Sequence, residues 1–244
     1  MTQERAFAWW KWALVALLGL FVWQFIVNTD FIAFQLLQSF GWLDGAGPIW
    51  PAITTIIAAA IALPGFALVY RWPGGGLRRL GLTLEKWRSD VVLGLGVGAL
   101  QSGLSIFLII PLLGSAADDT FASVSGLFES PARIAASIIL LLVYGGLIEE
   151  LFFRGHIITS VGNALGGHKW SRAIAVALSA ALFAISHDYQ GVVGMSYAMF
   201  AALIWAILFV WTRRLTASIV AHGSYDLLTL IGIIVFYSDK VSSG

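Results

Sequence analysis

The sequence predicts an all-α fold, a polytopic transmembrane helix bundle of about seven spans. Its composition points there first: 59% of the 244 residues are hydrophobic, only 11% are charged, and the mean hydropathy is +0.88. A second observation is that apolar runs of about 20 residues, the length that crosses a bilayer as a helix, recur along the chain. These runs do not alternate polar and apolar residues, so a β-barrel is not expected.

The first apolar run, "WWKWALVALLGLFVWQFIV", is too long for a signal peptide, and no small-x-small cleavage site follows it. We therefore expect it to be a retained first span. Segment 31–43 is shorter and mixes polar with apolar residues, which is typical of a helix lying in the membrane interface. The expected spans are 9–27, 49–70, 91–113, 133–153, 172–190, 191–211 and 215–237.

Two features inside the spans predict local structure. Pro64 should kink the second span. Gly94 and Gly98, four residues apart in the third span, predict a close contact with another helix. The segment "WPGGGLRR", at 72–79, is the clearest helix-breaking cluster.

The distribution of basic residues predicts the orientation in the membrane. With seven spans and an inner N-terminus, 12 of the 14 Lys and Arg residues lie inside, and only Arg133 and Lys240 lie outside. Positive charge is enriched on the inner side of membrane proteins, so we expect an outer C-terminus and an outer loop at 116–130.

The composition also excludes several kinds of chemistry. There are no cysteines, which excludes disulfides, thiolate zinc sites, iron–sulfur clusters and a cysteine nucleophile. The formal net charge is +1, so there is no basic footprint for nucleic acid, and none is expected as a partner.

The stretch "GGLIEELFFRGHI" places three charged side chains in an apolar helix. Glu150 and Arg154 are four residues apart, so they share a helix face and can pair. Glu149 points about 100° away and has no such local cation. An unpaired carboxylate at this depth can act as a base toward water. Alternatively, all three residues form an inert buried ion cluster that fixes helix packing.

Two further motifs place histidines at helical spacing. Phe183 and His187 share a face in "FAISH", where a single histidine is also compatible with a structural role. His222 and Asp226 share a face in "HGSYD", a spacing typical of metal ligands or of acid–base pairs, and also of a simple hydrogen-bonded pair. The remaining histidines, His156 and His168, are expected near the inner loop in contact with water.

In this order, Glu-Glu-x-x-x-Arg, Phe-x-x-x-His and His-x-x-x-Asp resemble the CPBP family, the CaaX proteases and bacteriocin-processing (Abi) enzymes. The resemblance covers about 135–235. It divides the chain into motif-free transmembrane helices at 1–130 and a CPBP-type catalytic core at 131–237, in which four helices carry the motifs.

The resemblance implies a metal-independent glutamate endopeptidase without a covalent intermediate or a cofactor. Glu149 and His187 would activate water, Glu150 and Arg154 would hold their helix in place, and His222 with Asp226 would stabilise the oxyanion. The family carries Asn or Asp at position 226. Because ionised Asp cannot donate a hydrogen bond, Asp226 is either protonated or orients His222, which then donates alone.

The implied partners are membrane lipid and a peptide or lipid-modified protein substrate, and the implied location is the cell membrane, with multiple spans. The family does not define the substrate here, nor whether it is prenylated. Two other functions stay open. One is a zinc hydrolase using His187, His222 and a carboxylate, although HExxH is missing. The other is a non-enzymatic scaffold, immunity factor or proton-coupled transporter that uses the intramembrane glutamate.

The expected span limits create one conflict. They put Glu149 near the inner face and His187 near the outer face, roughly 20 Å apart in depth. The two cannot share a water at that separation. We therefore expect the helix of Glu149 to continue toward Ala164 and the next helix to start nearby.

Overall fold

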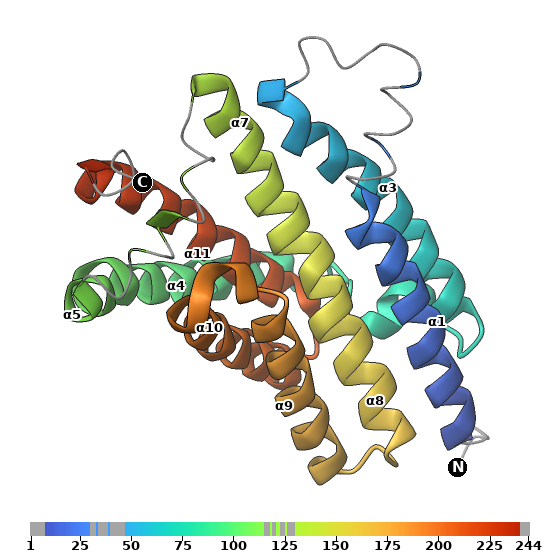
Figure 1. Cartoon of the computed structure of the whole chain (residues 1–244). Helices are drawn as coiled ribbons and strands as arrows, with labels where there is room; N and C mark the ends of the chain where they lie inside the picture. Colours follow the sequence, from blue (N-terminus) through green and yellow to red (C-terminus); the bar gives the residue numbers. More distant parts are fainter. Residues whose placement is uncertain are drawn as a thin grey trace.

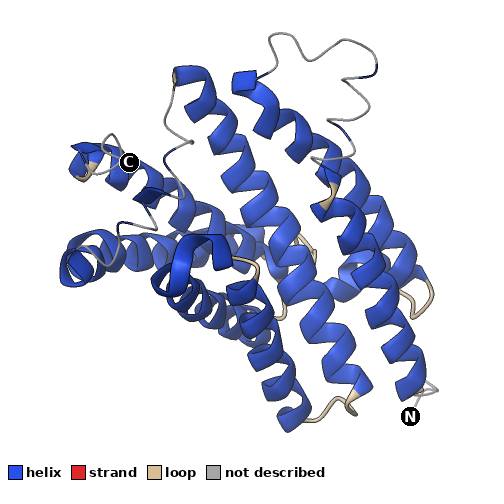
Figure 2. Cartoon of the chain, in the orientation of Figure 1, coloured by secondary structure: helices blue, strands red, loops and turns tan. Residues whose placement is uncertain are grey.

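The protein, described here by a computed structural model, is a bundle of helices, and no strand occurs in the part of the chain that is described (Figure 2). The described residues are 8–29, 47–114 and 130–239, with isolated positions at 33, 39, 118, 121, 122 and 125. The predicted polytopic helix bundle is confirmed. The expected interfacial helix at 31–43 and the loop at 116–130 fall almost entirely outside the described residues.

The long helices follow one another along the chain. The main elements are α1 (Trp9–Val27), α3 (Trp50–Arg71), α4 (Trp87–Leu104) with η3 (Ser105–Ile109) and α5 (Ile110–Leu113), α7 (Pro131–Ile139) with η6 (Leu140–Ile157) and α8 (Ile158–Ala164), α9 (Lys169–Ile185), α10 (Gly191–Thr212) and α11 (Leu215–Phe236). Short turns of helix are η1 (Gly47–Ile49), η2 (Gly76–Leu80) and η7 (Asp188–Gln190).

Among the described residues, 6 helices are long and apolar enough to cross a membrane. The expected fifth span, 172–190, differs from the structure: α9 has 17 residues, begins at Lys169 and ends at Ile185. The side chains of Ser186 and His187 both contact the carbonyl of Phe183, at 2.8 Å each. Polar side chains that bond to nearby carbonyls compete with the helix, which accounts for its early end.

The longest helix runs without a break from Pro131 to Ala164. The Ser130 hydroxyl caps its start by accepting from Arg133 N, and Gly166 and Gly167, with φ of 99° and 73°, form the turn that follows its end. Its continuation to Ala164 confirms the expected extension. The middle part, η6, has π-type turns rather than the α-helix assumed from the sequence, a local geometry frequent at functional sites.

In Figure 1 this long helix crosses the molecule, with α1 and α3 on one side of it and α9 and α10 on the other. Helix α11 packs against both α4 and η6. A Cβ added at Gly94 would lie 2.7 Å from Ala217 O, and one added at Gly98 would lie 2.6 Å from Ala221 O. The close helix contact predicted from these two glycines is therefore confirmed, with α11 as the partner. Helix α3 continues through Pro64.

The expectation that His156 lies in water is wrong. His156 is fully buried; its Nδ1 accepts from the Tyr70 hydroxyl at 3.1 Å and its Nε2 donates to Ala16 O at 3.1 Å. Its ring also lies beside those of Phe66 and Phe152. The long helix extends beyond its expected end, so α1 and α3 cover this position. His168, in contrast, is exposed, as predicted.

Candidate active site

Glu149 and His187 lie at similar heights above the turn that joins α8 to α9. Glu149 is fifteen residues before Ala164, and His187 is eighteen residues after Lys169. At about 1.5 Å per residue, each lies roughly 20–27 Å from that turn. Glu149 and His187 can therefore lie at a similar depth. The expected span limits had separated them because the helix of Glu149 ends later, at Ala164, and the next helix begins earlier, at Lys169, than those limits.

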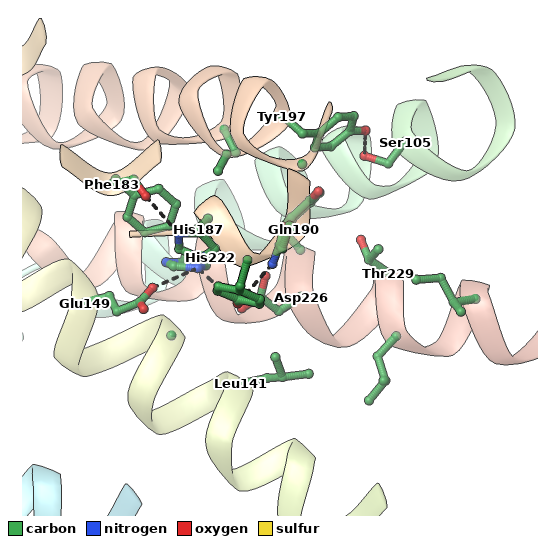
Figure 3. A pocket seen from close by; sticks show the side chains of 18 of the residues that line it. Ser105, Leu141, Glu149, Phe183, His187, Gln190, Tyr197, His222, Asp226 and Thr229 are labelled. Atoms are coloured by element: carbon green, nitrogen blue, oxygen red, sulfur yellow. Dashed lines mark hydrogen bonds and ion pairs between the residues drawn. The ribbon is translucent and has the colours of Figure 1, made fainter. Parts of the chain in front are cut away.

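A cavity of about 440 Å³ opens where η6, α10 and α11 face the segment that follows α9. Four of the six predicted site residues line it, namely Glu149, His187, His222 and Asp226. Figure 3 shows their side chains converging on one region of the cavity. Most other lining residues are apolar, among them Leu140, Leu141, Val193 and Ile233. The cavity thus combines a polar end with apolar walls.

Glu150 and Arg154, the other two predicted site residues, do not line this cavity. Both side chains are 0% exposed, and Glu150 Oε1 lies 2.9 Å from Arg154 Nη1. The predicted pairing is therefore present behind the cavity wall. Removing one partner of such a buried pair is strongly destabilising, because the other charge is left without compensation.

His222 lies between the two glutamates. Its Nδ1 is 2.9 Å from Glu150 Oε1, while its Nε2 is 3.3 Å from Asp226 Oδ2 and 3.9 Å from Glu149 Oε2. The side chain of Glu149 keeps 13% of its surface exposed, whereas that of Glu150 keeps none. The two neighbouring carboxylates therefore differ: Glu150 is enclosed by cations and donors, and Glu149 faces the cavity.

Aromatic rings of α9 and α10 lie against these polar groups. The Trp205 ring stacks on His222 with 3.7 Å between ring centroids and 19° between the planes. The guanidinium carbon of Arg154 lies 4.6 Å from the Phe183 ring centroid and 5.1 Å from that of Trp205. A cation over a ring face is stabilised by the π-electrons. These contacts restrict the positions of both His222 and Arg154.

Several cavity residues were not identified from the sequence. Tyr197 on α10 donates a hydrogen bond to Ser105 on η3, and Tyr225 also lines the cavity. Gln190 and Tyr189 of η7 line it as well, and the Gln190 amide donates to the Tyr189 hydroxyl at 3.0 Å. No spacing signal joins residues on such distant segments. Trp205 was hidden in the same way, because a tryptophan in an apolar span is unremarkable by itself.

Within the described part of the chain, no group of three or more His, Asp or Glu side chains is arranged to hold a metal ion. The nearest approach to such a group is at His222 Nε2, which faces the carboxylates of Asp226 and Glu149. His187 instead directs Nδ1 to the carbonyl of Phe183. The zinc hypothesis therefore lacks a preformed ligand set in this region.

Comparison with known proteins addresses the same part of the chain. Residues 131–228 match a family model described as type II CAAX prenyl endopeptidase Rce1-like. Over 91 residues the chain is 30% identical to the membrane-embedded CAAX protease MroQ of Staphylococcus aureus (strain USA300). Both matches support the similarity of the chain to the CPBP family.

The CPBP match contains all six predicted site residues, since Glu149 is the first of them and Asp226 the last. The aligned part covers 37% of this chain and 36% of the staphylococcal protein. No solved structure matches the chain. The six long apolar helices and the membrane-embedded relative agree on a multi-pass membrane protein.

Proposed function

We propose that this protein, like the CPBP enzymes it resembles, is an endopeptidase that hydrolyses a peptide bond of a membrane-associated substrate, using a water molecule activated by Glu149. The observation that carries the proposal is the difference between the two adjacent glutamates. Glu150 is enclosed and shared by Arg154 and His222, whereas Glu149 faces the cavity with its Oε2 3.9 Å from His222 Nε2. A base must reach a water molecule, and only Glu149 has that access.

The proposed reaction begins with a water held between Glu149 and His187. The Glu149 carboxylate accepts a proton from this water as the water oxygen bonds to the scissile carbonyl carbon. The carbonyl π-electrons move to oxygen and form an oxyanion. When the intermediate collapses, the C–N bond breaks and the nitrogen takes the proton from Glu149. The products are a carboxylic acid and an amine, and Glu149 returns to its initial state.

His222 is placed to stabilise the oxyanion. Because the Glu150 carboxylate is paired with Arg154, it can only accept, so Nδ1–H of His222 donates to it. For Nε2 to donate to the oxyanion as well, the ring must be an imidazolium. Asp226, 3.3 Å from Nε2, supplies the negative charge that balances it. This arrangement favours an ionised Asp226 that orients His222, with His222 as the donor.

The charges of the cluster support this assignment. Arg154 balances Glu150, and the His222 imidazolium balances Asp226, so each buried ion has an opposite charge beside it. Glu149 is left as the single carboxylate without a full partner. A carboxylate that is not paired with a cation can accept a proton without breaking an ion pair.

The substrate class follows from the cavity and its setting. The apolar walls formed by residues such as Leu141 and Ile233 suit an apolar segment next to the cleaved bond. We therefore propose a peptide or lipid-modified protein substrate held at the cell membrane. Whether a prenyl group contributes is decided by comparing cleavage of the same peptide with and without it.

The decisive experiment compares protein termini in membranes that contain the wild-type chain or Glu149→Gln at equal abundance. Termini that depend on the wild type and disappear with Glu149→Gln support the proposal. If Glu149→Gln membranes contain the same set of termini, the proposal is wrong. A chelator separates the zinc alternative: we expect cleavage to continue in its presence, and loss of cleavage with recovery on adding zinc would favour the metal mechanism instead.

A further inference from the structure

A second cavity, of about 310 Å³, lies at the ends of η2, α8 and α10 and beside the first turns of α9. It shares no lining residue with the active-site cavity. Four arginines line it, and no acidic residue does; the arginines are Arg78, Arg79, Arg172 and Arg213. The neutral polar side chains of Thr159 and Asn163 complete the polar part of its wall.

The wall of this cavity is held by specific backbone contacts. Gly81 has a φ of 87°, and its carbonyl accepts from Leu215 N at 2.8 Å. A Cβ at Gly81 would lie 2.9 Å from the Phe209 ring and 3.1 Å from Arg213 O. The segment after α3 is therefore fixed against the turn between α10 and α11. Such close approach, at a left-handed φ, requires glycine.

The two adjacent arginines of that turn have different surroundings. Arg214 forms a two-point contact with Asp90, at 2.6 Å and 2.7 Å, and does not line the cavity. Arg213, whose φ is 58°, does line it. Since Asp90 is occupied by Arg214, it does not neutralise Arg213.

Three of the four arginines that line this cavity have no acidic partner in the described part of the chain. Arg78 lies 3.8 Å from Glu85 in an exposed pair, which contributes little, and Arg79 lies over the Trp12 ring. Neither Arg172 nor Arg213 has an ion-pair partner among the described residues. Partial removal from water, and then the charge of Arg172, lower the pKa of Arg213. Positive charges that line one cavity repel each other, and an anion bound between them removes this repulsion.

We propose that this cavity binds a phosphate group, either the headgroup of an anionic phospholipid or free phosphate. The guanidinium groups of Arg172 and Arg213 can each donate two parallel hydrogen bonds to phosphate oxygens. The cavity lies on the side that the distribution of Lys and Arg predicts to be the inner one. Basic pockets between transmembrane helices on that side are suited to anionic headgroups.

The test uses the full chain in a neutral detergent at fixed ionic strength. Thermal melting is measured while inorganic phosphate, short-chain phosphatidylglycerol or short-chain phosphatidylcholine is added. The key variant is Arg172→Gln/Arg213→Gln. Its matched control is Arg71→Gln/Arg88→Gln, which removes two exposed arginines that do not line the cavity. Arg172→Lys/Arg213→Lys keeps the charge and serves if the glutamine variant does not fold.

A ligand that binds only the folded protein raises the melting temperature. We expect phosphatidylglycerol to do so for the wild type and the control, with an apparent Kd at least about tenfold weaker for Arg172→Gln/Arg213→Gln. The lysine variant should lie between them. A comparable shift with inorganic phosphate assigns the site to free phosphate, and a shift with phosphatidylglycerol alone assigns it to a headgroup. An equal shift with phosphatidylcholine, an equal loss in both glutamine variants, or no shift with either anion would overturn the proposal.

Discussion

Glu150 on η6 contacts His222 on α11, with 2.9 Å between Oε1 and Nδ1, across 72 residues of sequence. The same oxygen lies 2.9 Å from Nη1 of Arg154. One carboxylate therefore joins two helices and balances a buried guanidinium, at a place where its side chain has no exposed surface. Any change to Glu150 affects the packing of η6 and the orientation of His222 together.

Glu150→Gln should destabilise the protein. The substitution keeps the shape but leaves Arg154 as a buried cation without its anion, which costs about 3–5 kcal/mol. We expect the variant, purified in detergent, to melt several degrees below the wild type. A melting temperature equal to that of the wild type would show that the buried pair contributes little to stability.

Glu149→Gln should have the opposite pattern. Its side chain is partly exposed to the cavity, and its Oε2 lies 3.9 Å from Nε2 of His222. We therefore expect an unchanged melting temperature and a loss of cleavage of about 10²–10⁴-fold, because glutamine cannot accept the proton of water. If Glu149→Gln is the unstable variant and Glu150→Gln the inactive stable one, the roles of the two glutamates are reversed.

Asp226→Asn and Asp226→Ala should both lose activity, by about 10²–10³-fold. In the wild type, Asp226 Oδ2 lies 3.3 Å from His222 Nε2 and balances the charge of the imidazolium that donates to the oxyanion. Neither asparagine nor alanine carries this negative charge. Turnover of one cleaved peptide by the three proteins is the measurement. An Asp226→Asn variant with most of the wild-type activity would show that the charge of Asp226 is not required.

Gly98→Ala should destabilise the contact between α4 and α11, because the added Cβ would lie 2.6 Å from Ala221 O and 2.9 Å from Tyr225 N. Overpacking of this kind costs about 1–3 kcal/mol. Gly96→Ala on the same helix is the control, since its Cβ would meet nothing within 4 Å. Melting of both variants in detergent tests the contact, and equal melting temperatures would contradict it.

The C-terminus should lie outside and the loop between α3 and α4 inside. The outcome depends on whether α9 crosses the membrane. If only the 6 long apolar helices cross, both ends of the chain lie on the same side. If α9 is a seventh crossing, the two ends lie on opposite sides. The prediction rests on the unequal distribution of basic residues. Reporter fusions at the C-terminus and near Gly74 provide the measurement, and a reporter that places both on the same side would refute the topology.

Much of the site was predictable because its elements are local. Glu150 with Arg154, and His222 with Asp226, are four residues apart, and helical spacing alone brings each pair together. The different surroundings of Glu149 and Glu150 followed from the same geometry. The close approach at Gly94 and Gly98 was predictable because small residues are what allow two helix backbones to meet.

Other features depended on packing between segments that are distant in sequence. The helical bundle, the local charged pairs and the candidate residues are predictable from the amino-acid sequence, because hydrophobic length and helical period act within one segment. Tertiary structure alone decided that Glu150 contacts His222, that Trp205 stacks on that ring, that His156 is buried and that Arg154 lies behind the cavity. The physical reason is that apolar helix surfaces are nearly alike, so they do not specify depth or partner. Contacts between small residues and buried polar groups specify both, and these contacts exist only once the helices have packed.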